Sequence, residues 1–184
     1  SKNSFFYKKR LIILDVLLVL WVLYVLFPLH GVGFISDDSY NSQIAGKNLF
    51  EGLSFWQDLF KEIKAWLIGN GRFSPFAWFY TKALYSLQPS PYIVKSITLA
   101  IIALNVLFYS KIIQFITKNA RLSYICGFMV PLLFQFRMWH DPIIGFTFMI
   151  PMLSMFLFAS LLVLTKYLEK NEVKTISLFY AYQT

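Results

Sequence analysis

The stretch "FQFRMWHDPIIGF" carries Arg137, His140 and Asp141 almost side by side, between two long apolar runs. A histidine exchanges protons near neutral pH, and a neighbouring aspartate and arginine suit acid/base or ligand-positioning chemistry. The structural alternative is equally concrete, because an Asp-Pro step such as Asp141-Pro142 is typical of the first turn of a helix. Either way, His140 and Asp141 are expected at the start of a helix.

Two other stretches hold candidate reactive groups. The acidic pair Asp37-Asp38 can accept a proton from a hydroxyl or an amine, or help to hold a divalent cation, whereas helix capping would explain it without any function. Arg72 lies in the glycine-rich "GNGRFSP", where a guanidinium suits either a phosphate clamp or a lipid-headgroup contact. No cofactor is certain, and a divalent metal held by Asp37 and Asp141 stays open.

The composition is that of an integral membrane protein. Of the 184 residues, 58% are hydrophobic and 14% are charged, against about 25% charged in soluble domains, and the mean hydropathy is +0.58. The net charge of +8 comes from basic clusters beside apolar runs, which indicates contacts with membrane lipids and not with nucleic acid. The single cysteine, Cys126, offers neither a disulfide nor a Cys-based metal site.

Four apolar runs approach the length of about 20 residues that a membrane-spanning helix needs. They cover residues 11–29, 92–116, 122–139 and 143–165. A fifth run, 75–87, has roughly 13 residues, a length typical of interfacial or re-entrant segments. A further apolar segment begins at 175–184, so we expect 1–184 to form a single membrane domain at the start of a longer chain.

Polar side chains inside these runs have simple structural explanations. Asp15 can reach Lys9 or Arg10, and Lys95 and Lys111 lie near opposite ends of the second run, where their ammonium groups can extend to the membrane surface. We therefore expect the charges of the spans to be directed toward water.

The loop at 30–91 is expected to contain surface helices. Over 55–68, seven apolar residues fall within an arc of about 140° at the α-helical period, and Asp58 belongs to the polar remainder with Gln57, Lys61, Glu62 and Lys64. This amphipathic helix would lie on the membrane or pack on protein, and the glycines at 69 and 71 end it. One helix is predicted from Ser36 or Asp37 to Gly52, and another opens at Ser74-Pro75 and runs to Leu87.

The distribution of basic residues predicts the topology. With four spans and 75–87 outside the bilayer, three basic clusters face the cytoplasm, as the positive-inside rule requires. They are Lys2 to Arg10, Lys118 with Arg121, and Lys166 to Lys174. The N-terminus is then cytoplasmic, and the loop 30–91 and the stretch "RMWHDP" share the opposite face.

This combination resembles the GT-C superfamily of membrane glycosyltransferases, which includes the protein O-mannosyltransferases and the aminoarabinose transferases. In that family an acidic pair opens the first outer loop, as Asp37-Asp38 does here, and juxtamembrane helices follow. The second outer loop carries an Asp before Pro and an aromatic-rich span, as Asp141 does in "HDPIIGF". The family has further spans and an outer domain, so the resemblance implies the N-terminal part of such an enzyme.

The resemblance implies inverting transfer of a sugar from a polyprenyl-phosphate donor to an unknown acceptor, in a bacterial inner or plasma membrane. Asp37 or Asp38 would deprotonate or orient the acceptor, and Asp141 would position the acceptor or a metal. The leaving phosphate would be neutralised by basic side chains, namely Arg72, His140 and Arg137. The alternative is a small non-enzymatic membrane protein, such as a lipid-linked-sugar translocase subunit or an assembly factor. A translocase should place polar groups along the bundle interior.

The topology has a direct test. Cysteines introduced at Asn119 and Glu172 should react with a membrane-impermeant maleimide only from the cytoplasmic side, because both positions lie in the basic loops. Labelling of either position from the outside would contradict the four-span arrangement.

Overall fold

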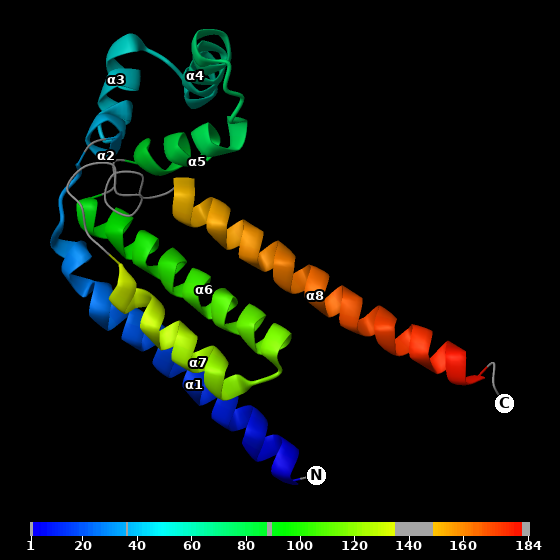
Figure 1. Cartoon of the computed structure of the whole chain (residues 1–184). Coiled ribbons are helices and arrows are strands. Elements are labelled where there is room, and N and C mark those ends of the chain that lie inside the picture. Colours follow the sequence, from blue (N-terminus) through cyan, green and yellow to red (C-terminus); the bar gives the residue numbers. More distant parts are fainter. Residues whose placement is uncertain (1, 36, 88–89, 135–148, 182–184) are drawn as a thin grey trace. The chain divides into compact units, whose positions relative to one another are not determined.

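The computed structural model describes residues 2–35, 37–87, 90–134 and 149–181, and within them the chain is helical with no strand (Figure 1). The α-helices are α1 (Lys2–Leu26), α2 (Asp37–Asn41), α3 (Ile44–Glu51), α4 (Phe55–Asn70), α5 (Pro75–Tyr85), α6 (Pro91–Thr117), α7 (Ala120–Met129) and α8 (Met149–Ala181). Two 3-10 helices, η1 (Phe27–Gly31) and η2 (Val130–Leu133), extend α1 and α7. The all-α prediction is confirmed for this part of the chain.

Three described segments are long and apolar enough to cross a membrane: Lys9–Gly31, Pro91–Thr117 and Ile150–Lys170. They correspond to the predicted spans at 11–29, 92–116 and 143–165. The predicted span at 122–139 is helical over Ala120–Leu133, which is shorter than the usual length of about 20 residues, and 135–148 lie outside the described residues. The predicted span at 122–139, and with it the total of four spans, is therefore not confirmed.

The remaining boundaries differ in two places from those expected. The single helix expected to run up to Gly52 is two helices, α2 and α3, separated by a turn in which the Ser42 hydroxyl donates to the Ser39 carbonyl oxygen at 2.7 Å. Serine side chains favour such local bonds over helix continuation. Where a new apolar segment was expected at 175–184, α8 continues without a break to Ala181.

The chain divides into two compact units. The membrane unit comprises Ser1–Val25, Ile101–Phe134 and Leu153–Thr184, and the loop unit comprises Leu26–Ala100 and Gln135–Met152. The helices α1, α6 and α8 contribute residues to both. All interactions described below lie within one unit or the other.

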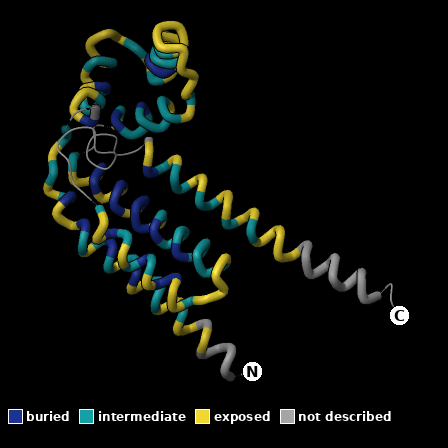
Figure 2. Tube along the Cα trace, viewed as in Figure 1, coloured by how far each residue is buried: buried dark blue, intermediate teal, exposed yellow. Residues whose placement is uncertain are grey.

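Close helix packing holds α1, α6 and α7 together in the membrane unit. Leu18 is fully buried. A Cβ atom added to Gly127 would lie 3.0 Å from the Cδ2 atom of Leu18 and 3.3 Å from the Cβ atom of Ser110. At the same contact, the hydroxyls of Ser110 and Ser123 lie 2.8 Å apart. Small residues and serine pairs of this kind are typical of membrane helix interfaces. Figure 2 shows buried residues on both α1 and α6.

Gly127 gives a test of this packing. Gly127→Val should lower the free energy of unfolding by about 1–3 kcal/mol, because the added carbons overlap Leu18 and Ser110. The matched control is Gly46→Val on α3, where a Cβ atom meets nothing within 4 Å, and it should change stability little. The stability of each variant is measured by titrating the protein in mixed micelles with sodium dodecyl sulfate and recording the unfolding midpoint. Equal midpoints for the two variants would rule out close contact at Gly127.

Candidate functional site

The six residues predicted for a site are described to different degrees. Arg137, His140 and Asp141 lie outside the described residues. Asp37 is the first residue of α2, and its side chain is not described, whereas Asp38 and Arg72 are described fully. The expected convergence of Asp141 with the Asp37-Asp38 pair therefore stays a prediction, and the site is built here from Asp38 outward.

Asp38 forms a buried ion pair. Its side chain is almost completely buried, and the Lys95 ammonium on α6 donates to its Oδ2 atom at 3.0 Å. The expectation that Lys95 reaches the membrane surface is wrong, because this residue is only 2% exposed. A buried carboxylate needs a partner of this kind, since an isolated charge costs several kcal/mol. The pair fixes the start of α2 against the first turns of α6, which capping alone would not do.

Aromatic side chains surround the neighbouring junction between η1 and α6. His30 lies 3.0 Å from the Ser96 hydroxyl, and its ring is 5.2 Å from that of Tyr92 and 5.7 Å from that of Phe27, centroid to centroid. His30 therefore takes part in the interface between η1 and α6. The residues next to His30 in the sequence give no indication of this role, because its partners Tyr92 and Ser96 lie more than sixty residues later.

A second buried ion pair was not anticipated. Asp58 on α4 and Lys82 on α5 approach to 2.6 Å, with exposed side-chain fractions of 1% and 3%. The Asn48 amide on α3 donates to Asp58 Oδ2 at 3.0 Å, and Glu62 lies 3.8 Å from the Lys82 ammonium. Asp58, which the helical period places among the polar residues of this helix, is thus buried in an ion pair. The sequence feature that could have indicated this pair is Lys82, the one charged residue in the largely apolar α5.

The predicted amphipathic helix is α4, and its apolar arc serves two purposes. Ser54 caps it with Gln57 in a reciprocal capping box, and Gly71 ends it with a positive φ of 62°. One side packs on α5, where Trp66 contacts Trp78 with ring centroids 5.5 Å apart. The other side leaves large apolar residues exposed, namely Trp56, Phe60, Leu67 and Ile68. Protein packing thus accounts for only half of the arc.

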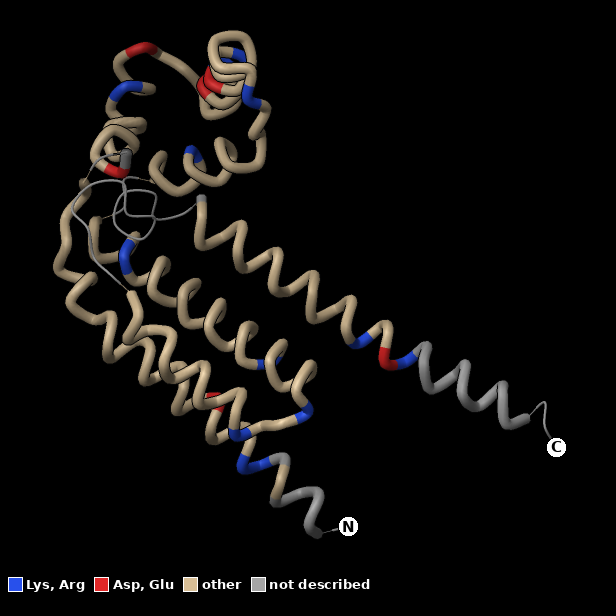
Figure 3. Tube along the Cα trace, viewed as in Figure 1, with Lys and Arg blue, Asp and Glu red and all other residues tan. Residues whose placement is uncertain are grey.

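Arg72 follows the end of α4 and is exposed. Its backbone N–H donates to the Trp66 carbonyl oxygen at 3.3 Å, which anchors the turn, and among the described residues its guanidinium has no ion-pair partner. A guanidinium held at a fixed turn without a protein carboxylate can bind a phosphate in bidentate fashion. Figure 3 shows few charged residues along α1, α6 and α8 and a group of them on α4.

Titratable groups outside the spans show two simple effects. Burial raises the pKa of Tyr80 on α5 to about 12. The hydrogen bond from Lys61 lowers the pKa of Glu51, an exposed pair that links α3 to α4 at 2.9 Å. Within the described residues, no group of three potential metal ligands occurs. Asp141 and the side chain of Asp37 lie outside the described part of the chain, so the metal suggested for them stays a prediction.

Comparison of the chain with family models, with curated proteins and with solved structures finds no match. The resemblance to the GT-C glycosyltransferases therefore rests on the short motifs of the sequence. Since fold alone does not specify activity, the function has to be argued from the geometry around Asp38 and Arg72.

The buried pair in the loop unit can be tested against the exposed one. Lys82→Met should destabilise the loop unit by about 3–5 kcal/mol, because it leaves the Asp58 carboxylate buried without a cation. The double variant Asp58→Leu/Lys82→Met should recover much of the loss. Lys61→Met, which breaks the exposed pair with Glu51, should have little effect. Limited proteolysis of the loop unit follows all three, and similar digestion of Lys82→Met and Lys61→Met would contradict the interpretation.

Proposed function

We propose that the chain is the N-terminal part of a membrane glycosyltransferase that transfers a sugar from a polyprenyl phosphate to an acceptor on the non-cytoplasmic face. The observation that carries this proposal is the buried pair of Asp38 with Lys95. It anchors one member of the acidic Asp37-Asp38 step to a membrane helix at the point where the first outer loop begins. An acidic pair that served only as a cap would not need this anchor.

The proposal includes a four-span topology with a cytoplasmic N-terminus in a bacterial plasma membrane. The loop unit then faces the outside, with α4 and α5 beside the membrane. Exposed Trp56, Phe60 and Ile68 on α4 support this placement, since tryptophan and phenylalanine on one helix face favour the membrane interface. A polyprenyl chain would remain in the bilayer while its phosphate reached the loop unit.

The residues divide into positioning and reacting groups. Asp38, held by Lys95, is a positioning residue, and Asp37 accepts the proton of the acceptor hydroxyl or amine. The freed electron pair attacks the anomeric carbon as its bond to the phosphate oxygen breaks, which inverts that carbon. Arg72 offsets the negative charge that develops on the leaving phosphate. Asp141 positions the acceptor, and His140 and Arg137 add positive charge near the donor.

One observation bears on the non-enzymatic alternative. A translocase needs polar groups along its interior, and Asp15, Lys111 and Ser110 lie within the membrane unit. Each is paired, however: Lys111 with Asp15, and Ser110 with Ser123. The tight approach at Gly127 leaves no room beside the serines for a substrate. These groups therefore hold helices together, which favours the enzyme.

Substitution of the acidic pair tests the proposal in the complete enzyme. Asp37→Asn should lower the rate of sugar transfer by about 10²–10⁴-fold, because the acceptor loses its general base. Glu51→Gln removes the same charge from an exposed position of the loop unit and should leave transfer unchanged. The readout is transfer of radiolabelled sugar from the polyprenyl-phosphate donor, with membrane insertion checked in parallel. A normally inserted Asp37→Asn enzyme with undiminished transfer would remove Asp37 from the mechanism.

A further inference from the structure

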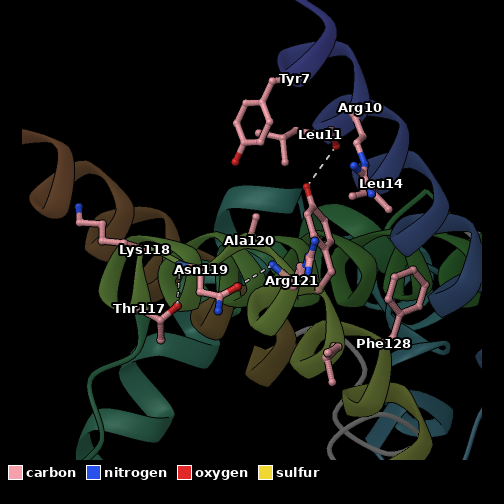
Figure 4. A pocket seen from close by; sticks show the side chains of 12 residues that line it. Tyr7, Arg10, Leu11, Leu14, Thr117, Lys118, Asn119, Ala120, Arg121 and Phe128 are labelled. Atoms are coloured by element: carbon pink, nitrogen blue, oxygen red, sulfur yellow. Dashed lines mark hydrogen bonds between the residues drawn. The ribbon is translucent and has the colours of Figure 1, made fainter. Parts of the chain in front are cut away.

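The membrane unit contains a cavity that the proposed reaction does not use. Its volume is about 980 Å³, and it lies between the N-terminal turns of α1 and the connection from α6 to α7 (Figure 4). Its lining includes the basic residues Arg10, Lys118 and Arg121 and the apolar residues Leu14, Ile125 and Phe128. The cavity is thus basic on one part of its wall and apolar on the rest.

Two guanidinium groups provide the positive charge. Arg10 comes from α1 and Arg121 from the first turn of α7, and neither has an ion-pair partner among the described residues. The third cation, Lys118, lies 3.5 Å from Glu169 of α8, so its charge is already offset. Arg10 and Arg121 therefore carry an uncompensated positive charge at one cavity.

The backbone of α7 does not attract the anion here. The Asn119 side-chain oxygen accepts hydrogen bonds from the backbone N–H groups of Arg121 and Leu122, at 3.0 and 3.2 Å. The first turn of α7 is thus already capped. An anion in the cavity would be held by the guanidinium side chains, which bind phosphate oxygens in pairs.

The apolar part of the cavity wall favours a phospholipid over a free phosphate ion as the ligand. Leu14, Ile125 and Phe128 line the cavity, and Ile125 is 57% exposed. A free phosphate ion would leave these side chains uncovered, whereas the acyl chain of a lipid would pack along them in van der Waals contact. The combination of two arginines with an apolar wall therefore fits an amphiphile.

We propose that this cavity binds an anionic phospholipid, with its phosphate between Arg10 and Arg121 and an acyl chain along Leu14, Ile125 and Phe128. The basic residues of this region are those that the charge rule assigns to the cytoplasm, and the cytoplasmic leaflet is the one rich in anionic lipids. The site is independent of the proposed glycosyl transfer, which would occur on the opposite face.

Native mass spectrometry of the intact chain in detergent tests the site. The protein is titrated with phosphatidylglycerol, with phosphatidylcholine and with inorganic phosphate. The wild type should bind one phosphatidylglycerol about tenfold more tightly than phosphatidylcholine, because the guanidiniums favour a net anionic headgroup. Excess inorganic phosphate should displace this lipid poorly, because it cannot cover the apolar wall.

Three double variants separate a site formed by Arg10 and Arg121 from a diffuse effect of positive charge. Arg10→Gln/Arg121→Gln should abolish the preference for phosphatidylglycerol, and Arg10→Lys/Arg121→Lys should keep only part of it, since lysine lacks the bidentate geometry. Lys9→Gln/Lys166→Gln removes the same charge from exposed positions outside the cavity and should keep the preference in full. Equal losses in the two glutamine variants, no preference in the wild type, or ready displacement by inorganic phosphate would each overturn the proposal.

Discussion

Burial of charge in an apolar chain is the constraint on which the described structure depends. Three aspartate–lysine pairs satisfy it: Asp38 with Lys95 and Asp58 with Lys82 are almost fully buried, and Asp15 with Lys111 is partly buried. The pairs are nested along the sequence, and in each the aspartate comes first. A lone charge in such surroundings costs several kcal/mol, so each aspartate has to meet its lysine as the chain returns. The folded-back path of the chain follows from this requirement as much as from its apolar faces.

The arginines behave differently from the buried lysines. Within the described residues, Arg10, Arg72 and Arg121 have no carboxylate partner and are exposed. A lysine ammonium is a compact charge that one carboxylate can satisfy, whereas a guanidinium presents a planar fork that matches phosphate. The two cation types are therefore used for two tasks. Lysines such as Lys82 and Lys95 neutralise buried acids, and the arginines remain available for phosphate.

Sequence periodicity predicted the elements better than their contacts. The helix at 55–68 and its glycine stop, the Ser74-Pro75 start and the long helix α6 are local signals, set by apolar spacing and capping residues. The partner of Lys95 is 57 residues away, and that of Lys111 is 96 residues away. In a sequence, a lysine that extends to the membrane surface looks the same as one that meets a buried aspartate. The candidate site was therefore predictable as residue types, while the role of Asp38 was not.

The buried pairs also explain how the acidic step could be positioned for chemistry. Apolar residues in place of a buried ion pair often give equal stability, so the pairs contribute chiefly by selecting one arrangement. Apolar helices can slide by a turn with little loss, but Lys95 meets Asp38 at only one register of α6. A general base must be held within a fraction of an ångström of its working position. Fixing Asp38 to a turn of α6 transmits that precision to the adjacent Asp37 through a single peptide unit, which an exposed cap at the end of a loop could not do.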